Sequence, residues 1–127
     1  MKNKKILGLV ELVEVQGTEG SIRKKALLDT GATRSSVDIR VAAKAGLGPI
    51  VNSVKVKSKT NSEGFIRRAV AKAVFVIRGV KIPVEVSIED RKNMPYKVLI
   101  GRDVIHSNFM IDLEKTHHSN KILDEHQ

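Results

Sequence analysis

The chain has 127 residues, of which 41% are hydrophobic and only 3% aromatic, a composition that fits one folded domain with an aliphatic core. It contains no cysteine, which excludes a disulfide framework and any thiolate metal site. The net charge of +9 would attract acidic peptides or nucleic acid, but one Tyr, three Phe and no Trp are too few stacking platforms for single-stranded nucleic acid.

An apolar run begins at Ile6, but Glu11 and Glu14 interrupt it too early for the hydrophobic region of a signal peptide. No apolar stretch in the sequence is long enough to cross a bilayer. Together with the absence of cysteine, these features predict a cytoplasmic protein that makes no membrane contact.

Short apolar segments separated by turn residues recur along the chain and predict strands. The clearest is residues 53–59, where Val54 and Val56 alternate with three lysines, as in a strand with one exposed face. Strands are predicted over residues 5–15, 21–29, 53–59, 65–77, 80–88, 97–100 and 109–113, with turns over residues 16–20 and 60–64.

Two short helices interrupt this pattern. Either Ser35 or Ser36 is the expected cap of a helix over residues 37–45, and Gly46 is its stop signal. Residues 102–106 are long enough for one further helical turn.

The many short strands predict an all-β fold, a closed or partly open barrel with one or two short helices. The sequence becomes polar after residue 115. We therefore expect one domain over residues 1–115 and a mobile C-terminal tail over residues 116–127.

Two segments combine apolar residues with a glycine and a charged residue. The first is Ala26-Leu-Leu-Asp-Thr-Gly-Ala32, in which Asp29 follows a buried strand and Gly31 permits a tight turn. The second is Val98-Leu-Ile-Gly-Arg-Asp-Val-Ile105, which comes much later in the chain.

In order and separation, these segments resemble those of the retropepsins, the small aspartic proteases typified by retroviral enzymes. The stretch from Asp90 to Arg102 is also similar to the retropepsin-like group named ATP-dependent zinc proteases. The resemblance implies a retropepsin-like barrel in which Asp29 is the catalytic residue. It also assigns roles in the active-site loop to three neighbours: Thr30 locks two loops across a dimer, Gly31 brings its backbone to the carboxylate, and Ala32 packs beneath.

The same resemblance places a flap, the hairpin that closes over a bound peptide, at the turn over residues 60–64. Gly64 and Phe65 are the flap candidates, and Gly101 and Arg102 are the structural support of the active-site loop. Retropepsins carry a second aspartate where this chain has Thr33, so Arg102 lacks its usual partner.

The alternative partners of Arg102 are Asp103 and Asp38. Both, like Asp112, are otherwise expected to be capping or surface carboxylates. Asp103 in particular could cap the short helix after Gly101.

Peptide hydrolysis without a metal needs an activated water and a polarised carbonyl, which two carboxyls sharing one proton provide. One chain supplies only one Asp-Thr-Gly, so the second must come from another copy related by a two-fold axis. The prediction is an aspartic endopeptidase that acts as a homodimer on peptide or protein substrates and needs no cofactor.

Other functions were weighed against this one. A retropepsin-like domain can be a non-catalytic dimerisation or peptide-binding module, and a basic β-barrel could bind nucleic acid. The lysines at 55, 57 and 59 form a solvated strand face, guard a sheet edge or contact an acidic substrate. The related group is linked to ligases that add glutamates to proteins, which implies an acidic peptide.

A zinc site is not expected. A zinc protease typically carries His-Glu-x-x-His on a helix, and the sequence has no such motif. Of the four histidines, one lies in the barrel domain and three in the predicted tail: His106, His117, His118 and His126.

Overall fold

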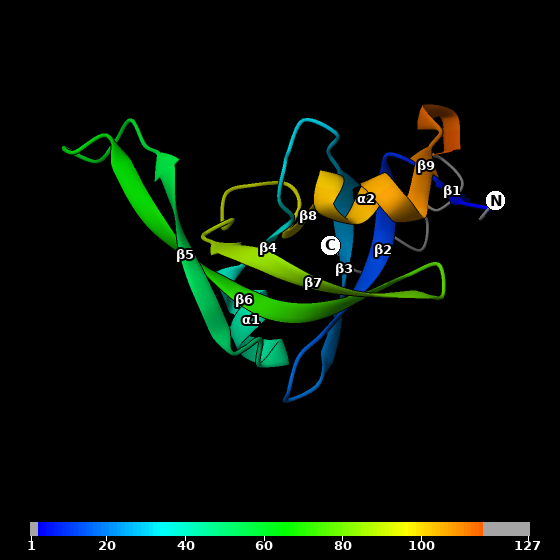
Figure 1. The fold of residues 1–127 in the computed structure, drawn as a ribbon, viewed down its shortest axis with the longest axis horizontal. Helices are drawn as coiled ribbons and strands as arrows, with labels where there is room; N and C mark the ends of the chain where they lie inside the picture. Colours follow the sequence, from blue (N-terminus) through cyan, green and yellow to red (C-terminus); the bar gives the residue numbers. More distant parts are fainter. Residues whose placement is uncertain (1–2, 116–127) are drawn as a thin grey trace.

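The structure is a computed structural model that describes residues 3–115, and strands account for most of it (Figure 1). Two short helices, α1 and α2, lie between strands. In chain order the elements are β1 (Lys5–Leu7), β2 (Val10–Gln16), β3 (Ser21–Leu28), β4 (Ser36–Asp38), α1 (Ile39–Ala45), β5 (Ile50–Lys57), β6 (Phe65–Ile77), β7 (Val80–Glu89), β8 (Val98–Ile100), α2 (Arg102–Asn108) and β9 (Phe109–Ile111).

Six strands close into a barrel, which confirms the predicted fold class. The sheet order is β2-β3-β8-β4-β7-β6-β5, and a further pairing of β2 with β6 closes the ring. The fifth strand stays outside this ring and pairs with β6 alone among the described strands. Two of the pairings are parallel, β3 with β8 and β4 with β7, so segments distant in sequence meet in the barrel wall.

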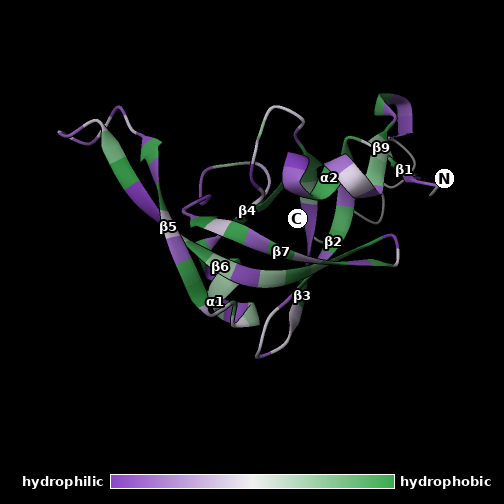
Figure 2. Cartoon of the chain, in the orientation of Figure 1, coloured by the Kyte–Doolittle hydropathy of each residue, from purple (hydrophilic) through white to green (hydrophobic). Residues whose placement is uncertain are grey.

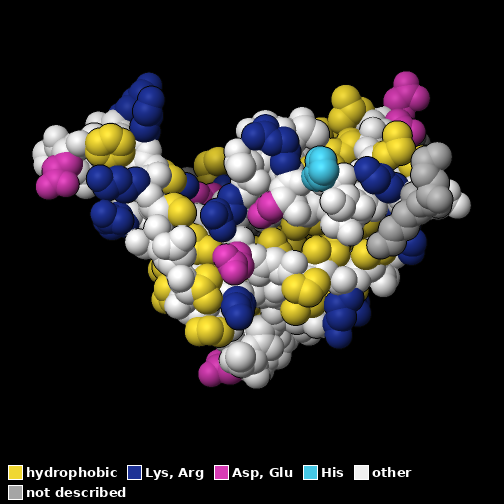
Figure 3. All heavy atoms as spheres, viewed as in Figure 1, with side chains coloured by type: hydrophobic (Ala, Val, Ile, Leu, Met, Phe, Trp, Pro, Cys, Tyr) yellow, Lys and Arg dark blue, Asp and Glu magenta, His cyan; other side chains and the backbone are white. Residues whose placement is uncertain are grey.

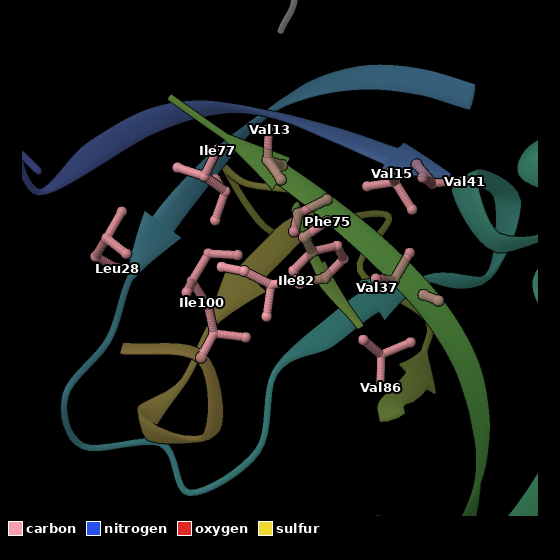
Figure 4. Close-up of a cluster of buried hydrophobic side chains, with 14 of the residues drawn as sticks. Val13, Val15, Leu28, Val37, Val41, Phe75, Ile77, Ile82, Val86 and Ile100 are labelled. Atoms are coloured by element: carbon pink, nitrogen blue, oxygen red, sulfur yellow. The ribbon is translucent and has the colours of Figure 1, made fainter. Parts of the chain in front are cut away.

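The barrel interior is filled by aliphatic side chains that alternate along the strands, as the period of two requires (Figure 2). On β6 the inward residues are Ala71, Ala73, Phe75 and Ile77, all buried. Phe75 is the largest of the fully buried side chains, and aliphatic residues from the other strands surround it (Figure 4).

The first predicted strand, residues 5–15, is in fact two strands. The break follows from Glu11, which is buried and accepts hydrogen bonds from the Gly8 amide at 2.7 Å and from the guanidinium of Arg78. The segment before the break leaves the barrel and pairs in parallel with β9, Ile6 facing Met110. Periodicity alone could not reveal this separation, because both halves are apolar.

The first helix begins later than predicted, and its cap is not a serine. Ser36 belongs to β4, and Asp38 caps α1 by accepting a hydrogen bond from the Arg40 amide at 3.0 Å. Gly46 ends the helix in the left-handed conformation, as predicted. The amides of Thr18 and Glu19, in the turn between β2 and β3, donate to the last carbonyls of α1.

The second helix begins at Arg102 as predicted but continues to Asn108, and its cap differs from the expectation. Gly101 is its N-cap and has no capping side chain, so Asp103 is not the cap. The final strand is shorter than the predicted 109–113, and the expected tail over residues 116–127 lies outside the described residues.

Beyond the barrel, β5 and the first half of β6 form an arm that projects away from it (Figure 1). We use "the arm" for residues 50–70. Its outer end points to the same side of the molecule as the loop between β3 and β4, at the top of the view.

Candidate active site

Asp29 lies at the first position after β3, where the chain leaves the barrel wall. Its amide donates to the Ile100 carbonyl at 2.8 Å, so the parallel ladder with β8 ends on this residue. The side chain is half-buried, and its Oδ1 accepts a hydrogen bond from the Gly31 amide at 2.8 Å. The carboxyl group is therefore held in a defined orientation at the end of the strand.

We call residues 29–35 the Asp29 loop. Within it, the Ala32 amide donates to the Asp29 carbonyl at 3.2 Å, which makes a tight turn at Thr30 and Gly31. Thr30 and Gly31 are exposed at the tip of the turn, and Ala32 is half-buried beneath it. The structure therefore brings together all four residues of the predicted active-site loop.

The start of α2 holds the Asp29 loop from behind. The Arg102 amide donates to the Ala32 carbonyl at 2.8 Å. The Arg102 guanidinium donates to the Thr30 carbonyl at 3.0 Å and to the Thr33 hydroxyl at 2.9 Å. The hypothesis that Arg102 pairs with Asp103 or Asp38 is wrong, because the neutral hydroxyl of Thr33 and a loop carbonyl take the guanidinium donors instead.

Gly101 is needed because the Asp29 loop crosses directly over it. A Cβ at this position would lie 2.8 Å from the Arg34 carbonyl carbon and 2.9 Å from the Ala32 carbonyl oxygen, closer than real Cβ contacts come. The structural support predicted for Gly101 and Arg102 thus has a geometric basis. Gly101 permits the loop to approach closely, and Arg102 binds the loop in that position.

A second set of contacts, which the sequence analysis missed, holds the far end of the loop. Ser35 is fully buried, and its amide and hydroxyl both donate to the Asp103 carboxylate. The Ser35 hydroxyl also accepts from the Gly101 amide at 2.9 Å. The only available signal was the pair of serines after the Asp-Thr-Gly-Ala segment, which local reasoning assigned to a helix cap.

The arm carries the two flap candidates at its outer end. Gly64 has φ of 79°, a conformation that favours glycine, and its carbonyl accepts from the Ser58 amide at 2.9 Å to close the turn. Phe65 follows and is 46% exposed, with the Lys55 ammonium 5.4 Å from its ring centre. The arm tip is closed by its own backbone: besides the Ser58–Gly64 bond, the Gly64 amide donates to the Asn61 carbonyl at 3.0 Å.

A buried ionic cluster stands beside the arm base. Arg91, only 6% exposed, is bound by the Glu89 carboxylate and donates to the Tyr96 carbonyl at 2.8 Å. Glu89 also pairs with Arg68 of the arm at 2.5 Å. The cluster therefore links the arm to the loop that precedes β8.

Asp38 anchors this cluster from below. Burial alone would raise the pKa of Asp38, but hydrogen bonds from the Arg91 and Arg40 amides and from the Arg40 guanidinium hold it below its ordinary value. Asp38 therefore remains ionised in the folded protein and serves as a structural carboxylate.

Two hollows lie in the surface of the described residues, and neither is lined by Asp29. The larger, about 560 Å³, lies against β6 and β7 and reaches the turn after β2. The smaller, about 350 Å³, lies behind the Asp29 loop and is lined in part by Thr33, Arg34 and Asp103. Asp29, whose side chain is half-buried, therefore contributes to neither hollow.

No group of three potential metal ligands occurs within residues 3–115. His106 is exposed on α2, and the other three histidines lie outside the described residues. Among the described helices, none combines the length and apolar character that a membrane crossing requires.

The fold is that of the retropepsins. A solution structure of the simian foamy virus protease matches with a TM-score of 0.54 and 22% identity, over 76% of this chain and 91% of the viral one. A protein of unknown function from Legionella pneumophila matches with a TM-score of 0.57 and 22% identity, over 87% of this chain and 94% of that one. No curated protein matches the chain at a significant level.

The family model described as RimB-like, retropepsin-like aspartic endopeptidase RimB, matches residues 42–121, which is more than half of the chain. The chain therefore belongs to the RimB-like family of retropepsin-like aspartic endopeptidases. The matched range includes the Gly101-Arg102 support and the arm, whereas the Asp29 loop lies before it.

Proposed function

We propose that the protein is an aspartic endopeptidase that is active as a homodimer, with Asp29 of each subunit forming the catalytic pair. One observation carries the proposal. The structure holds a single Asp-Thr-Gly turn directly after β3, and the loop that contains this turn projects to the same side of the molecule as the arm (Figure 1).

The mechanism requires two Asp29 carboxyls close enough to share one proton. The ionised carboxyl removes a proton from a water molecule, and the protonated one donates to the oxygen of the scissile carbonyl. The Gly31 amide donates to Asp29 Oδ1 at 2.8 Å and so fixes the orientation of the carboxyl group. Thr30 is exposed at the tip of the turn, where it can bond to the partner loop.

An apolar surface near the chain ends supports the dimer. Ile6 and Met110 face each other across β1 and β9 and are 47% and 59% exposed, and nearby Leu113 is 66% exposed. Contiguous exposed apolar side chains of this kind mark an interaction surface. A second copy of the chain is the partner that the single active-site loop calls for.

The decisive test compares Asp29→Asn with the wild-type protein on a peptide library. The variant should lose activity about 10³-fold or more, because an amide can neither share the proton nor accept it. Sedimentation should give the same dimer for both proteins. Glu19→Gln, which removes a carboxylate from the remote turn after β2, should keep full activity. Unchanged cleavage by Asp29→Asn would end the proposal.

The alternative is a non-catalytic module that dimerises and binds a peptide between the Asp29 loops and the arms without cleaving it. One observation favours it: the family match begins after the Asp29 loop, so it does not include the proposed catalytic residue. Binding of library peptides without cleavage, at mildly acidic and at neutral pH, would identify such a module. Cleavage that a statine-type inhibitor blocks would exclude it.

The proposed substrate is a peptide or protein with acidic side chains. Phe65 and Arg67 lie on one face of β6 in the arm, because side chains alternate with a period of two, and both are exposed. Cross-strand pairing places Lys55 and Lys57 on that same face. The arm thus presents three cations, Lys55, Lys57 and Arg67, on one exposed face, and basic side chains are visible on the arm in Figure 3.

We also propose a cytoplasmic location and a place near the group named ATP-dependent zinc proteases. Cysteine is absent from the sequence, which fits a reducing compartment. The zinc part of that group name finds no ligand set in residues 3–115. Chelation should therefore leave peptide cleavage unchanged.

A further inference from the structure

We propose that Ser35 and Asp103 form a positioning pair that sets the Asp29 carboxyl for catalysis. The inference rests on the proposed function, since it assigns these residues a part in placing the catalytic group. Neither residue touches the reacting atoms. Their effect passes through the Asp29 loop, which runs between them and β3.

The loop is anchored at both ends, and Ser35 forms the second anchor. At the first, the Asp29 amide is bound to the Ile100 carbonyl at 2.8 Å. At the second, the Ser35 amide donates to the two Asp103 oxygens at 3.1 and 3.0 Å, and its hydroxyl donates to one of them at 2.6 Å. The Ser35 carbonyl accepts from the Ser87 amide at 3.0 Å, which joins this anchor to the barrel wall.

The Ser35 hydroxyl is placed to satisfy two groups at once. It donates to Asp103 and accepts from the Gly101 amide at 2.9 Å, and both Ser35 and Gly101 are buried. Without the hydroxyl, the Gly101 amide would remain buried without an acceptor, which is costly. The same hydroxyl therefore fixes the loop to the residue over which the loop must cross.

This pair accounts for the absence of an aspartate at position 33. Arg102 binds the Thr33 hydroxyl and the Thr30 carbonyl, two neutral acceptors. The carboxylate that grips the loop is instead Asp103, on the first turn of α2, and it takes charge-assisted hydrogen bonds from Ser35.

Three variants test the proposal in the full-length protein: Ser35→Ala, Asp103→Ala and Asp103→Asn. The two alanine variants should lower kcat about 10²-fold with KM changed less than about 3-fold, because displacement of the catalytic group affects the chemical step. Asp103→Asn keeps an oxygen acceptor for Ser35 and should recover most of kcat. Two carboxyls that share one proton should give kcat/KM a bell-shaped dependence on pH. This bell should be narrower in the alanine variants, because the two carboxyls of the dimer would interact less.

Ser87→Ala is the matched control. Ser87 is also buried, on the adjacent strand, and the variant keeps the Ser87 amide that binds the Ser35 carbonyl. Its hydroxyl has no hydrogen-bond partner within the part of the chain that the structure describes. Its loss should leave kcat and the pH profile unchanged. An effect of the same size in Ser87→Ala would mean that general loosening of the core, and not positioning, explains the result.

A second measurement does not depend on activity. Hydrogen exchange at the Gly31 and Ala32 amides should be about tenfold faster in Asp103→Ala than in the wild type, because the loop opens more often. Normal kcat, pH profile and exchange in both alanine variants would overturn the positioning role even if Asp29→Asn is inactive. An inactive wild type with faster exchange in Asp103→Ala would instead overturn the proposed function and leave the anchoring intact.

Discussion

The Asp29 loop and the arm lie on the same side of the molecule but are built in opposite ways. The loop is held by α2 and by the barrel wall. It packs directly over Gly101, the Arg102 guanidinium binds it at Thr30 and Thr33, and buried Ser35 fixes its far end. The arm is a two-stranded ribbon whose outer residues, including Phe65, are exposed. Two-stranded ribbons are marginal by themselves, so the arm has freedom that the loop lacks.

The difference teaches where each task is placed. A group that must meet a partner carboxyl within a fraction of an ångström belongs on a rigid support. A segment that must admit and then cover a peptide needs freedom to move. The ion pair between Arg68 and Glu89 marks the boundary, because it ties only the arm base to the barrel.

Substitution of Gly101 should have the largest effect on stability and activity. Gly101→Ala should lower the free energy of unfolding by about 3 kcal/mol and abolish cleavage, because the new Cβ would overlap the Asp29 loop backbone. Urea denaturation measures the first effect and peptide cleavage the second. Gly48→Ala, where a Cβ meets nothing within 4 Å, should change neither. A fully stable and active Gly101→Ala would show that the loop is not held as tightly as described.

The ionic cluster beside the arm base should give the next largest effect. Asp38→Asn should cost about 2–4 kcal/mol of unfolding free energy at pH 7, because it removes the charge that Arg91 and Arg40 surround. The exposed Asp90→Asn is the control and should leave the urea midpoint unchanged.

The same variant predicts a pH dependence with a definite sign. Because the pKa of Asp38 is lowered in the folded protein, its contribution is fully present above its ordinary value of 3.8 and is lost as the pH falls through the lowered value. The stability difference between wild type and Asp38→Asn should therefore be constant near neutral pH and shrink on acidification. Urea melts at pH 7 and at a series of acidic pH values would measure it, and a difference that grew in acid would refute the assignment.

Substitutions in the arm should change peptide binding, with little effect on the free energy of unfolding. Phe65→Ala should raise KM about 5-fold with little change in the urea midpoint, because Phe65 is exposed in the free chain and is proposed to cover the peptide. Ile50→Ala, which removes another exposed apolar side chain at the opposite end of β5, should leave KM unchanged. A large loss of stability in Phe65→Ala would mean that the arm is as firmly packed as the loop.

The smallest effect concerns charge on the arm. Lys55→Gln should raise KM for an acidic peptide about 2- to 3-fold and weaken its dependence on salt, because one exposed cation contributes little in water. Lys81→Gln, on the exposed face of β7, is the control with the same loss of charge. If both variants raised KM equally, the lysines of the arm would act only through the net charge of the protein and not through contact with the peptide.

Much of the candidate site could be predicted from the sequence because its signals are local. The apolar pair before Asp29, the turn residues Thr30 and Gly31, and the later Gly101-Arg102 pair are short motifs with a direct conformational meaning. Strand periodicity likewise predicted the barrel, since alternation is a property of neighbouring residues. The roles of these residues in catalysis remain predictions.

Contacts between distant segments were decided by the tertiary structure alone. The Ser35–Asp103 pair and the separation of β1 from β2 depend on partners that lie far away in the chain. The cap of α1 is a local contact, but Ser35, Ser36 and Asp38 were all candidates for it and the sequence did not decide among them. A serine near a helix start fits a cap and a buried anchor equally well, and only the position of α2 behind the loop decides between them. The sequence by itself predicted most of the strands and the turn that carries the carboxylate, but it missed β4 and the break between β1 and β2. The packing of those segments decided what holds that carboxylate in place, because hydrogen-bond partners are chosen by proximity in space and not by order along the chain.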